Sequence, residues 1–341
     1  MQITFIRNAA ELDALAEDWN HLLARAVTDV PFLRHEFQST WWSTLGGGEW
    51  ENGELWIGVG HDERGELTGL APLFLTQTRE ERKGLMFVGS IEIADYLDFI
   101  VPFEIVDPFV EALLVALEEK GPPEWEVLDL YNIPQESPSL QVLKDAASRR
   151  SWVVTQERLQ PCPVITFDGT WEDYLTSLDK KQRQELKRKM RRVERDPSGV
   201  VWKLVSPEDD AAAAAKDFLE LMATDLRKVE FLTPKMRVQF QHLIQAAHAN
   251  GWLHLSFLDV GSRRAAGYLS FDYGDRLWVY NSGVNAAYLS LSPGWVLLGH
   301  MIRWAVENGR REFDFLRGDE KYKYQLGGQE RYIYRLRISR G

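Results

Sequence analysis

The spacing of apolar side chains divides the first half of the chain into amphipathic helices and short strands. Between Glu11 and Arg25, apolar residues recur every three or four positions, which predicts a helix with one buried face. Shorter apolar runs predict strands. In chain order the expected elements are strand Ile3–Ile6, helices Glu11–Arg25 and 34–45, strands Leu55–Val59, Leu67–Leu75, Leu85–Val88 and Tyr96–Val101, a helix from Asp107, strand Val127–Leu130, helix Leu140–Arg149, and strands Val153–Glu157 and Val164–Phe167.

The second half repeats this order of elements. Its expected elements are strand Val200–Val205, helices from about Pro207 and Pro234, strands Leu253–Leu258, Ala265–Phe271 and Leu277–Ser282, a helix from Ser292, strand Glu312–Phe315 and a closing strand Tyr332–Leu336. Asp107-Pro108 and Ser292-Pro293 open helices at matching places in the two halves. The repeated order predicts a structural duplication. The mixture of helices and hairpin strands favours an α/β or α+β fold, with sheets covered by helices.

A basic segment joins the two halves. Thr170 followed by Asp173 fits a capping box that starts a helix over 171–196. The apolar residues of this helix share one face: Leu175, Leu178, Leu186, Met190 and Val193. Lys180–Arg195 holds nine Lys/Arg against two Glu, so the other face is strongly positive.

The charge of the chain is divided unevenly. Residues 1–160 carry 12 Lys/Arg and 28 Asp/Glu, a net charge of −16, whereas residues 161–341 carry 28 Lys/Arg and 23 Asp/Glu, a net charge of +5. This asymmetry indicates two domains with different partners, and we expect the boundary between residues 168 and 169. The positive half suits an anionic cofactor. The total of −11 argues only weakly against nucleic acid, because local patches matter more than the sum.

Cysteine and histidine usage excludes several classes of site. The single cysteine, Cys162, allows no intrachain disulfide and no cysteine-based zinc site. The seven histidines are scattered without ligand spacing, so no metal is expected. Neither a signal peptide nor a run of about 18 uncharged apolar residues is visible, and we expect a cytoplasmic chain without a membrane span.

The candidate chemistry lies near the end of the chain. Ser292-Pro293-Gly294-Trp295 combines a good N-cap residue with a first-turn proline. Backbone N–H groups at such a helix start can bind an anion such as a pyrophosphate, although an ordinary serine-capped helix shows the same pattern. A charged, aromatic loop, Arg317–Tyr324, follows the next strand, where an α/β site would place its chemistry. This order of parts favours an acyltransferase.

Three stretches carry a resemblance to a known family: 174–183 with its basic continuation, Ser292-Pro293-Gly294 with its helix, and 313–323. Asp95–Asp98 is a weaker match. The chain resembles the two-domain GNAT-like acyltransferases related to the Fem aminoacyltransferases. Within them it is most similar to the bacterial branch associated with cellulose or exopolysaccharide biosynthesis.

The resemblance implies tandem duplicated GNAT-like domains, each a mixed, mostly antiparallel sheet covered by helices. Residues 1–168 would form the acceptor side without a donor site, and 169–341, led by the basic helix, would hold the donor. In ordinary GNAT enzymes the pyrophosphate of coenzyme A lies on a glycine-rich turn before the central helix. Here that turn, Tyr288–Gly294, has a single glycine. The resemblance therefore implies acetyl-CoA or another acyl-CoA as the donor, or else the aminoacyl-tRNA used by the Fem relatives.

Acyl transfer to an amine needs a polarised carbonyl, an amine freed of its proton, a proton for the leaving thiolate, and bound donor phosphates. We expect Asp319 and Glu320 to take the proton, Tyr322 to return one to sulfur, and Arg317 to neutralise a phosphate or carboxylate. Alternatively, Arg317 and Asp319 pair to hold the loop. The residues expected to contact the donor are Asn281, Ser282, Gly283, Ser292, Gly294, Trp295 and Lys323.

Two further groups are candidates for binding the substrates. Asp95 and Asp98 lie in an apolar context, where unpaired carboxylates are costly to bury. They can receive an acceptor ammonium, cap a turn, or pair with the basic helix. On that helix, Lys181, Arg183 and Lys187 can contact donor phosphates, tRNA or a phosphorylated carrier; alternatively, the helix face docks against the acidic first half.

The main functional hypothesis is an N-acyltransferase that moves an acetyl or other acyl group from acyl-CoA to an amine of a sugar, amino acid or small metabolite. A second keeps the fold but takes the acyl group from aminoacyl-tRNA. A third is a catalytically silent GNAT-fold binding subunit. The sequence leaves the acceptor and the oligomeric state open.

Overall fold

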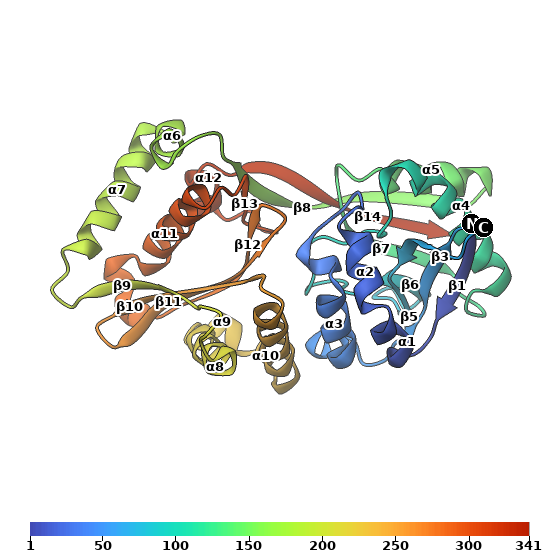
Figure 1. The fold of residues 1–341 in the computed structure, drawn as a ribbon, viewed down its shortest axis with the longest axis horizontal. Coiled ribbons are helices and arrows are strands. Elements are labelled where there is room, and N and C mark those ends of the chain that lie inside the picture. Colours follow the sequence, from blue (N-terminus) through green and yellow to red (C-terminus); the bar gives the residue numbers. More distant parts are fainter. Residues whose placement is uncertain (341) are drawn as a thin grey trace. The chain divides into compact units, whose positions relative to one another are not determined.

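The computed structural model describes residues 1–340, apart from the side chains of Leu226 and Arg227, and these residues form two compact units (Figure 1). Unit 1 comprises Met1–Gln160 and the chain from Tyr332 on, and unit 2 comprises Pro161–Arg331. Two strands, β8 (Val153–Thr166) and β14 (Gln329–Ser339), cross from one unit into the other.

Unit 1 contains two sets of strands. Strands β1, β3 and β4 form an antiparallel sheet, and β2, β5, β6, β7 and β14 follow one another in a mixed sheet. The strands are β1 (Gln2–Ile6), β2 (Glu54–Leu55), β3 (Ile57–His61), β4 (Leu67–Ala71), β5 (Leu73–Gln77), β6 (Lys83–Phe87) and β7 (Val127–Pro134). The helices are α1 (Ala9–Ala14), α2 (Ala16–Leu23), α3 (His35–Gly48), α4 (Val106–Lys120) and α5 (Ser139–Arg149).

Unit 2 is built on one sheet with helices on both faces. Strands β9 to β12 are antiparallel neighbours, β13 pairs parallel with β12, and the end of β8 pairs antiparallel with β13. The strands are β9 (Val200–Leu204), β10 (Leu253–Val260), β11 (Arg263–Tyr273), β12 (Arg276–Val284) and β13 (Glu312–Asp314). The helices are α6 (Trp171–Ser177), α7 (Lys180–Glu194), α8 (Ala211–Met222), α9 (Leu226–Val229), α10 (Pro234–Ala249), α11 (Pro293–Glu307) and α12 (Lys321–Gln325).

The same motif recurs in both units. Each has a strand, a helix and a second strand parallel to the first: β6, α4 and β7 in unit 1, and β12, α11 and β13 in unit 2. The other strand pairs of the described residues are antiparallel, so the predicted mixed, mostly antiparallel sheets covered by helices are confirmed. Among residues 1–340, no helix is long and apolar enough to cross a bilayer.

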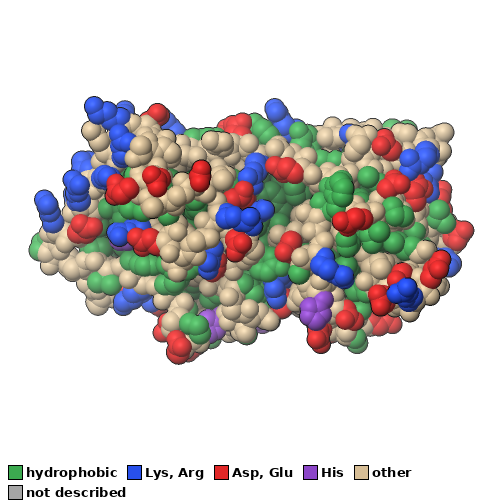
Figure 2. Space-filling model, turned by 45° about the horizontal axis from the view of Figure 1, so that its top comes forward, with side chains coloured by type: hydrophobic (Ala, Val, Ile, Leu, Met, Phe, Trp, Pro, Cys, Tyr) green, Lys and Arg blue, Asp and Glu red, His purple; other side chains and the backbone are tan. Residues whose placement is uncertain are grey.

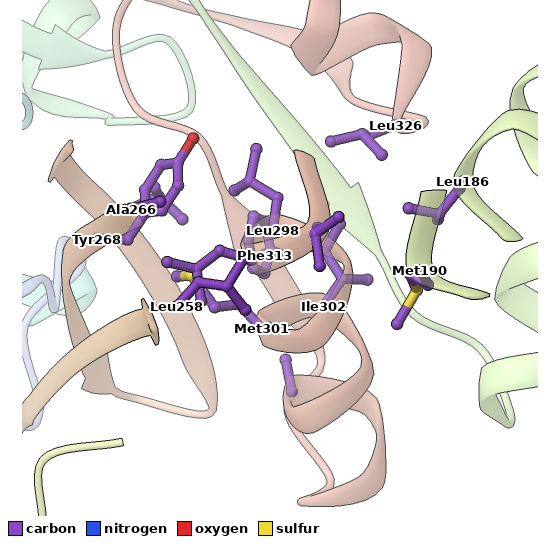
Figure 3. Packing of buried hydrophobic residues seen from close by; sticks show 14 of the residues in the cluster. Leu186, Met190, Leu258, Ala266, Tyr268, Leu298, Met301, Ile302, Phe313 and Leu326 are labelled. Carbon is purple, nitrogen blue, oxygen red and sulfur yellow. The ribbon is translucent and has the colours of Figure 1, made fainter. Parts of the chain in front are cut away.

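The core of unit 2 lies between the sheet and helix α11 (Figure 3). Helix α7 packs on the outer side of α11, where Gly299 allows close approach: a Cβ there would meet Leu186 Cδ1 and Met190 Sδ at 3.0 Å. The apolar face predicted for the basic segment is buried as expected. The single helix predicted over 171–196 is wrong, because Leu178 adopts an extended conformation, buries its side chain and separates α6 from α7. The predicted capping box at Thr170 is confirmed.

The strand predicted at Tyr96–Val101 is also wrong. This buried segment forms only an isolated bridge between Ile100 and Leu70. Other hydrogen bonds hold this part of the chain: the Asn132 amide donates to the carbonyl oxygens of Ile91 (2.8 Å) and Ala94 (2.7 Å) just before the segment, and Leu97 N–H donates to Asn132 O (2.9 Å). A buried segment can leave regular structure when its backbone groups are satisfied in this way.

A buried histidine makes the stability of unit 2 depend on pH. His254 on β10 is 1% exposed, its Nε2 has no hydrogen-bond partner among the described residues, and its ring lies 4.4 Å from that of Trp304. Burial lowers the pKa of His254 from 6.5 to about 4, although the charge of Asp272 opposes this.

Below pH 6.5 the unfolded chain therefore binds a proton at His254 that the folded chain excludes. The contribution of His254 to the free energy of unfolding is therefore largest above pH 6.5 and falls by about 3 kcal/mol as the pH decreases toward 4. We predict that His254→Leu removes this part of the pH dependence in urea denaturation at pH 7 and pH 4.5. Parallel losses of stability in both proteins would contradict this assignment.

Candidate active site

Strands β12 and β13 run parallel for three paired positions and then part. The pairs are Arg276 with Glu312, Leu277 with Phe313 and Trp278 with Asp314. Beyond them β12 continues beside β11 to Val284, while the chain after β13 turns at Leu316, a non-glycine residue with a left-handed φ of 56°. We call the region beyond the pairs, Val279–Val284 and Phe315–Glu320, the strand fork.

A β-bulge lies on the β12 side of the strand fork. The register with β11 shifts between Leu269 and Ser270, which leaves Tyr280 as an extra residue in β12. Bulges re-aim backbone groups and are frequent next to active sites. The side-chain oxygen of Asn281 accepts from the Ser282 N–H (2.8 Å) and from Lys228 Nζ (2.9 Å). Asn281, predicted to contact the donor, is thus anchored to α9 at this bulge.

Gly283 has a packing role. A Cβ at this position would lie 2.7 Å from the backbone nitrogen of Met222 and 2.8 Å from the carbonyl carbon of Leu221. The end of α8 therefore lies directly against β12, and only glycine fits there without a backbone shift.

The start of α11 differs from the prediction in one respect. Ser292 occupies the N-cap position, but its side chain makes no capping hydrogen bond because its backbone is left-handed (φ 53°, ψ 50°). Pro293 has no N–H, and the first helical bond runs from Val296 N–H to Ser292 O (3.1 Å). No described residue accepts a hydrogen bond from the N–H groups of Gly294 and Trp295, which therefore remain available to an external acceptor. The predicted N-cap position of Ser292 is confirmed, but the capping hydrogen bond is missing, so the Ser292 side chain does not occupy these N–H groups.

The turn after β13 is fixed by two side chains. Asp314 Oδ1 accepts from the Leu316 N–H at 2.7 Å. Lys323, only 2% exposed, donates from Nζ to the carbonyl oxygens of residues 316–318 at 3.1, 2.6 and 3.3 Å, and lies 3.0 Å from the Glu320 carboxylate. The ammonium of Lys323, predicted to contact the donor, is thereby occupied in holding this turn.

Two phenols and a carboxylate gather at the strand fork. Burial and the negative charge of Glu320 raise the pKa of Tyr322 above its usual value. Burial, with Tyr322 and Glu320 nearby, also raises the pKa of Tyr268, whose hydroxyl bonds with Ser282. That hydroxyl lies 3.6 Å from where a Cβ of Gly294 would be, and Figure 3 shows it turned away from the packed side chains. Both phenols are neutral hydrogen-bond donors at pH 7.

Asp319 belongs to a different, exposed cluster. Tyr324 Oη donates to Asp319 Oδ1 at 2.7 Å and lies 3.2 Å from Glu330 Oε1. The predicted carboxylates Asp319 and Glu320 are therefore adjacent in sequence but have different neighbours. Arg317 precedes both carboxylates in the sequence and is half-buried. Its carbonyl oxygen accepts a hydrogen bond from Lys323 Nζ.

The acidic residues predicted to bind the acceptor lie in unit 1. Asp98 is 1% exposed and accepts hydrogen bonds from Thr28 Oγ1 (2.6 Å), Ser137 Oγ (2.5 Å) and the Phe99 N–H (2.8 Å). Burial raises its pKa in spite of these bonds. Asp98 thus links its own segment to the segments of Thr28 and Ser137 within unit 1. Asp95 is buried in the same segment.

The basic residues singled out on α7 have separate surroundings. Lys187 Nζ pairs with Glu172 at 3.1 Å, and Arg183 Nη1 reaches the Thr176 carbonyl oxygen at 3.5 Å. Lys181 is exposed and has no ion pair with the described residues. Figure 2 shows several blue side chains at its left end, the end at which Figure 1 labels α7.

Tyr268 and Lys228 were not predicted from the sequence. Tyr268 lies within an apolar strand pattern that reads as core, and it meets Ser282 only through the register of β11 with β12. Lys228 reaches β12 from a four-residue helix that has no periodic signal. Both contacts depend on tertiary pairing, which local spacing does not encode.

The glycine in the turn after β13 gives a testable prediction. Gly318 has a φ of 124°, and a Cβ there would collide with the Glu320 carboxylate and lie 2.9 Å from Lys323 Nζ. We expect Gly318→Ala to lower the free energy of unfolding by about 2 kcal/mol or more in urea denaturation. Gly309→Ala is the control: its φ is 72° but nothing lies within 4 Å, so the backbone alone costs about 1 kcal/mol. Equal losses for the two variants would contradict the crowding at Gly318.

The comparisons with known proteins agree with this geometry. Residues 180–324 match the family model described as an acetyltransferase (GNAT) domain. This stretch contains the strand fork, the start of α11 and the polar cluster with Glu320 and Tyr322. No curated protein matched the sequence of the chain.

Several solved structures share the fold over the whole chain. FemX is similar with a TM-score of 0.67 at 12% identity, over 98% of this chain and 97% of that one. A DUF2156 domain, described as the C-terminal domain of a lysylphosphatidylglycerol synthetase from Agrobacterium fabrum, gives 0.58 at 12% identity, over 98% and 93%. A tandem GNAT protein from the clavulanic acid biosynthesis pathway gives 0.51 at 11% identity, over 98% of each chain. The chain thus has a tandem GNAT-like fold, and residues 180–324 in unit 2 match the GNAT acetyltransferase domain model.

Proposed function

We propose that unit 2 transfers an acetyl or other acyl group from acyl-CoA to an amine of a sugar, amino acid or small metabolite. The observation that carries this proposal is the pair of free N–H groups, on Gly294 and Trp295, at the start of α11 beside the strand fork. A helix N-terminus with free amides suits a pyrophosphate. A sugar amine is among the expected acceptors because the sequence resembles the exopolysaccharide-associated branch.

The polar cluster at the strand fork supplies groups for the reaction. The amine nitrogen attacks the thioester carbonyl carbon, the C–N bond forms and the C–S bond breaks. Glu320 accepts the proton lost by the amine, and Tyr322 donates a proton to the leaving thiolate and regains one from solvent. Tyr268, neutral and buried beside Gly294, is positioned to donate a hydrogen bond to the donor.

We further propose that unit 1 binds no donor. The link between β6 and α4 runs over residues 88–105, whereas the corresponding link in unit 2 is only 285–292. The longer link is largely buried, and Leu97 N–H donates to Asn132 O on β7 at 2.9 Å. The place beside β7 that corresponds to the strand fork is thus taken by the chain's own residues, which supports an acceptor-side role.

An aminoacyl-tRNA donor is the second candidate. It is favoured by the full-length fold similarity to FemX and by the positive outer face of α7. Two observations on the purified protein distinguish the donors: whether an acyl-CoA raises its melting temperature, and whether RNA copurifies with it.

We expect acetyl-CoA to raise the melting temperature of the chain. A ligand at a hundredfold its dissociation constant adds about 2.7 kcal/mol to the free energy of unfolding, which for a chain of this length is a shift of a few degrees in differential scanning fluorimetry. Absence of a shift with any acyl-CoA, together with RNase-sensitive RNA that copurifies, would favour the tRNA donor. Absence of both would favour the silent binding subunit.

A further inference from the structure

A groove of about 490 Å³ lies between the first half of α7 and the first turn of α11. Lys181, Arg188 and Lys189 line it from α7, Trp295 from α11 and Gln325 from the end of α12. The one acidic residue in the lining, Glu185, pairs with Arg188 at 2.8 Å and with Lys189 at 3.5 Å. Three cations against one carboxylate leave the groove positive, so it suits an anion.

The cations of the groove are held in different ways. Lys189 has a side-chain exposure of only 16%, and its Nζ lies 4.4 Å from the centre of the Trp295 ring and near Glu185. A cation fixed between an aromatic face and a carboxylate is already oriented before a ligand arrives. Lys181 and Arg188 are more exposed and can move onto a bound phosphate.

Trp295 connects this groove with the start of α11. Its ring lines the groove, and its backbone N–H is one of the two free amides there. A ligand that binds both places must carry two neighbouring anionic groups, because Trp295 belongs to both. Coenzyme A has this chemistry: a pyrophosphate on the 5′ side and a phosphate on the 3′ side of a single ribose.

We propose that the groove between α7 and α11 binds the 3′-phosphate of the coenzyme A donor, through Lys181, Arg188 and Lys189. This inference rests on the proposed function and adds the residues that bind the nucleotide end of the donor. It differs from the sequence-based expectation, since Arg183 and Lys187 make other contacts and do not line the groove.

The other side of α7 provides a matched control. A second groove, of about 480 Å³, is lined by residues of α7 and its C-terminal end alone; Arg188 borders both grooves, whereas Arg191 and Arg192 line only this one. It has the same charge character but no residue of α11. A ligand bound at the start of α11 should therefore not contact this second groove.

The test compares coenzyme A with 3′-dephospho-coenzyme A by isothermal titration calorimetry in about 0.1 M salt. The wild type should bind coenzyme A about tenfold more tightly. Lys181→Gln/Arg188→Gln should lose this preference, with about tenfold weaker binding of coenzyme A and unchanged binding of the dephospho form. Arg191→Gln/Arg192→Gln should behave like the wild type.

Several results would overturn the inference. One is a wild type that binds both ligands equally, and another is a Lys181/Arg188 variant that loses affinity for both to the same extent. If the Arg191/Arg192 variant also lost its preference for coenzyme A, the preference would come from the overall positive charge of α7 and not from the groove. A wild type that binds neither ligand would contradict the proposed function itself. The single variants Lys181→Gln and Arg188→Gln, checked by circular dichroism, keep the test valid if the double variant fails to fold.

Discussion

Glu320→Gln should lower the rate of acyl transfer by about 10²-fold or more while the chain stays folded. Glutamine keeps the shape of the side chain but cannot accept the proton of the attacking amine, and general-base catalysis is worth about 10²- to 10⁴-fold. The measurement is release of the coenzyme A thiol from acetyl-CoA, with any amine from a panel that supports turnover by the wild type. Circular dichroism and the melting temperature check the fold.

Asp319→Asn is the matched control for this prediction. Asp319 is the next residue in the chain and bonds with Tyr324 in the exposed cluster, so its variant should stay within about threefold of the wild-type rate. A large loss for Asp319→Asn and none for Glu320→Gln would reverse the assignment. Equal, small effects would show that the enzyme works without a dedicated base.

Arg335→Ala should destabilise unit 1 by about 3–5 kcal/mol, the usual cost of leaving a buried charge without its partner. Arg335 on β14 donates to both carboxylate oxygens of Asp129 on β7, at 2.7 Å each, and Asp129 is 1% exposed. The pair therefore fastens the last strand of the chain into unit 1. Urea denaturation of the full chain, followed by circular dichroism, measures the loss.

Arg337→Ala serves as the control on the same strand. Its guanidinium pairs with Glu80 at 2.9 Å, but the side chain is 35% exposed, and exposed pairs contribute about 1 kcal/mol or less. Replacing both members of the buried pair, in Arg335→Met/Asp129→Leu, should recover much of the stability. If Arg335→Ala costs no more than Arg337→Ala, the pair does not hold the strand.

The fold was predictable where the signal is local. Helical spacing gave the apolar face of α7, and the Ser292-Pro293 pattern gave the start of α11, because side-chain period and cap residues act within a few positions. The repeated order of helices and strands along the chain was visible in the same local patterns. These local patterns were enough to predict sheets covered by helices.

The failures share a tertiary cause. Apolar residues at Tyr96–Val101 suggested a strand. Instead, Asn132 donates hydrogen bonds to backbone carbonyl groups just before this segment, and the segment is buried without forming a strand. The left-handed backbone at Ser292 follows from the turn before α11, so the favoured N-cap residue makes no cap. Tyr268 reaches the strand fork only through the pairing of β11 with β12. Local composition carries no information on these contacts.

A crystal structure of the chain with coenzyme A is the most direct test of the donor site. The pyrophosphate oxygens should lie within about 3 Å of the N–H groups of Gly294 and Trp295, with the pantetheine arm directed toward Val279–Val284. Coenzyme A bound in unit 1, or at a place in unit 2 away from the start of α11, would contradict the assignment.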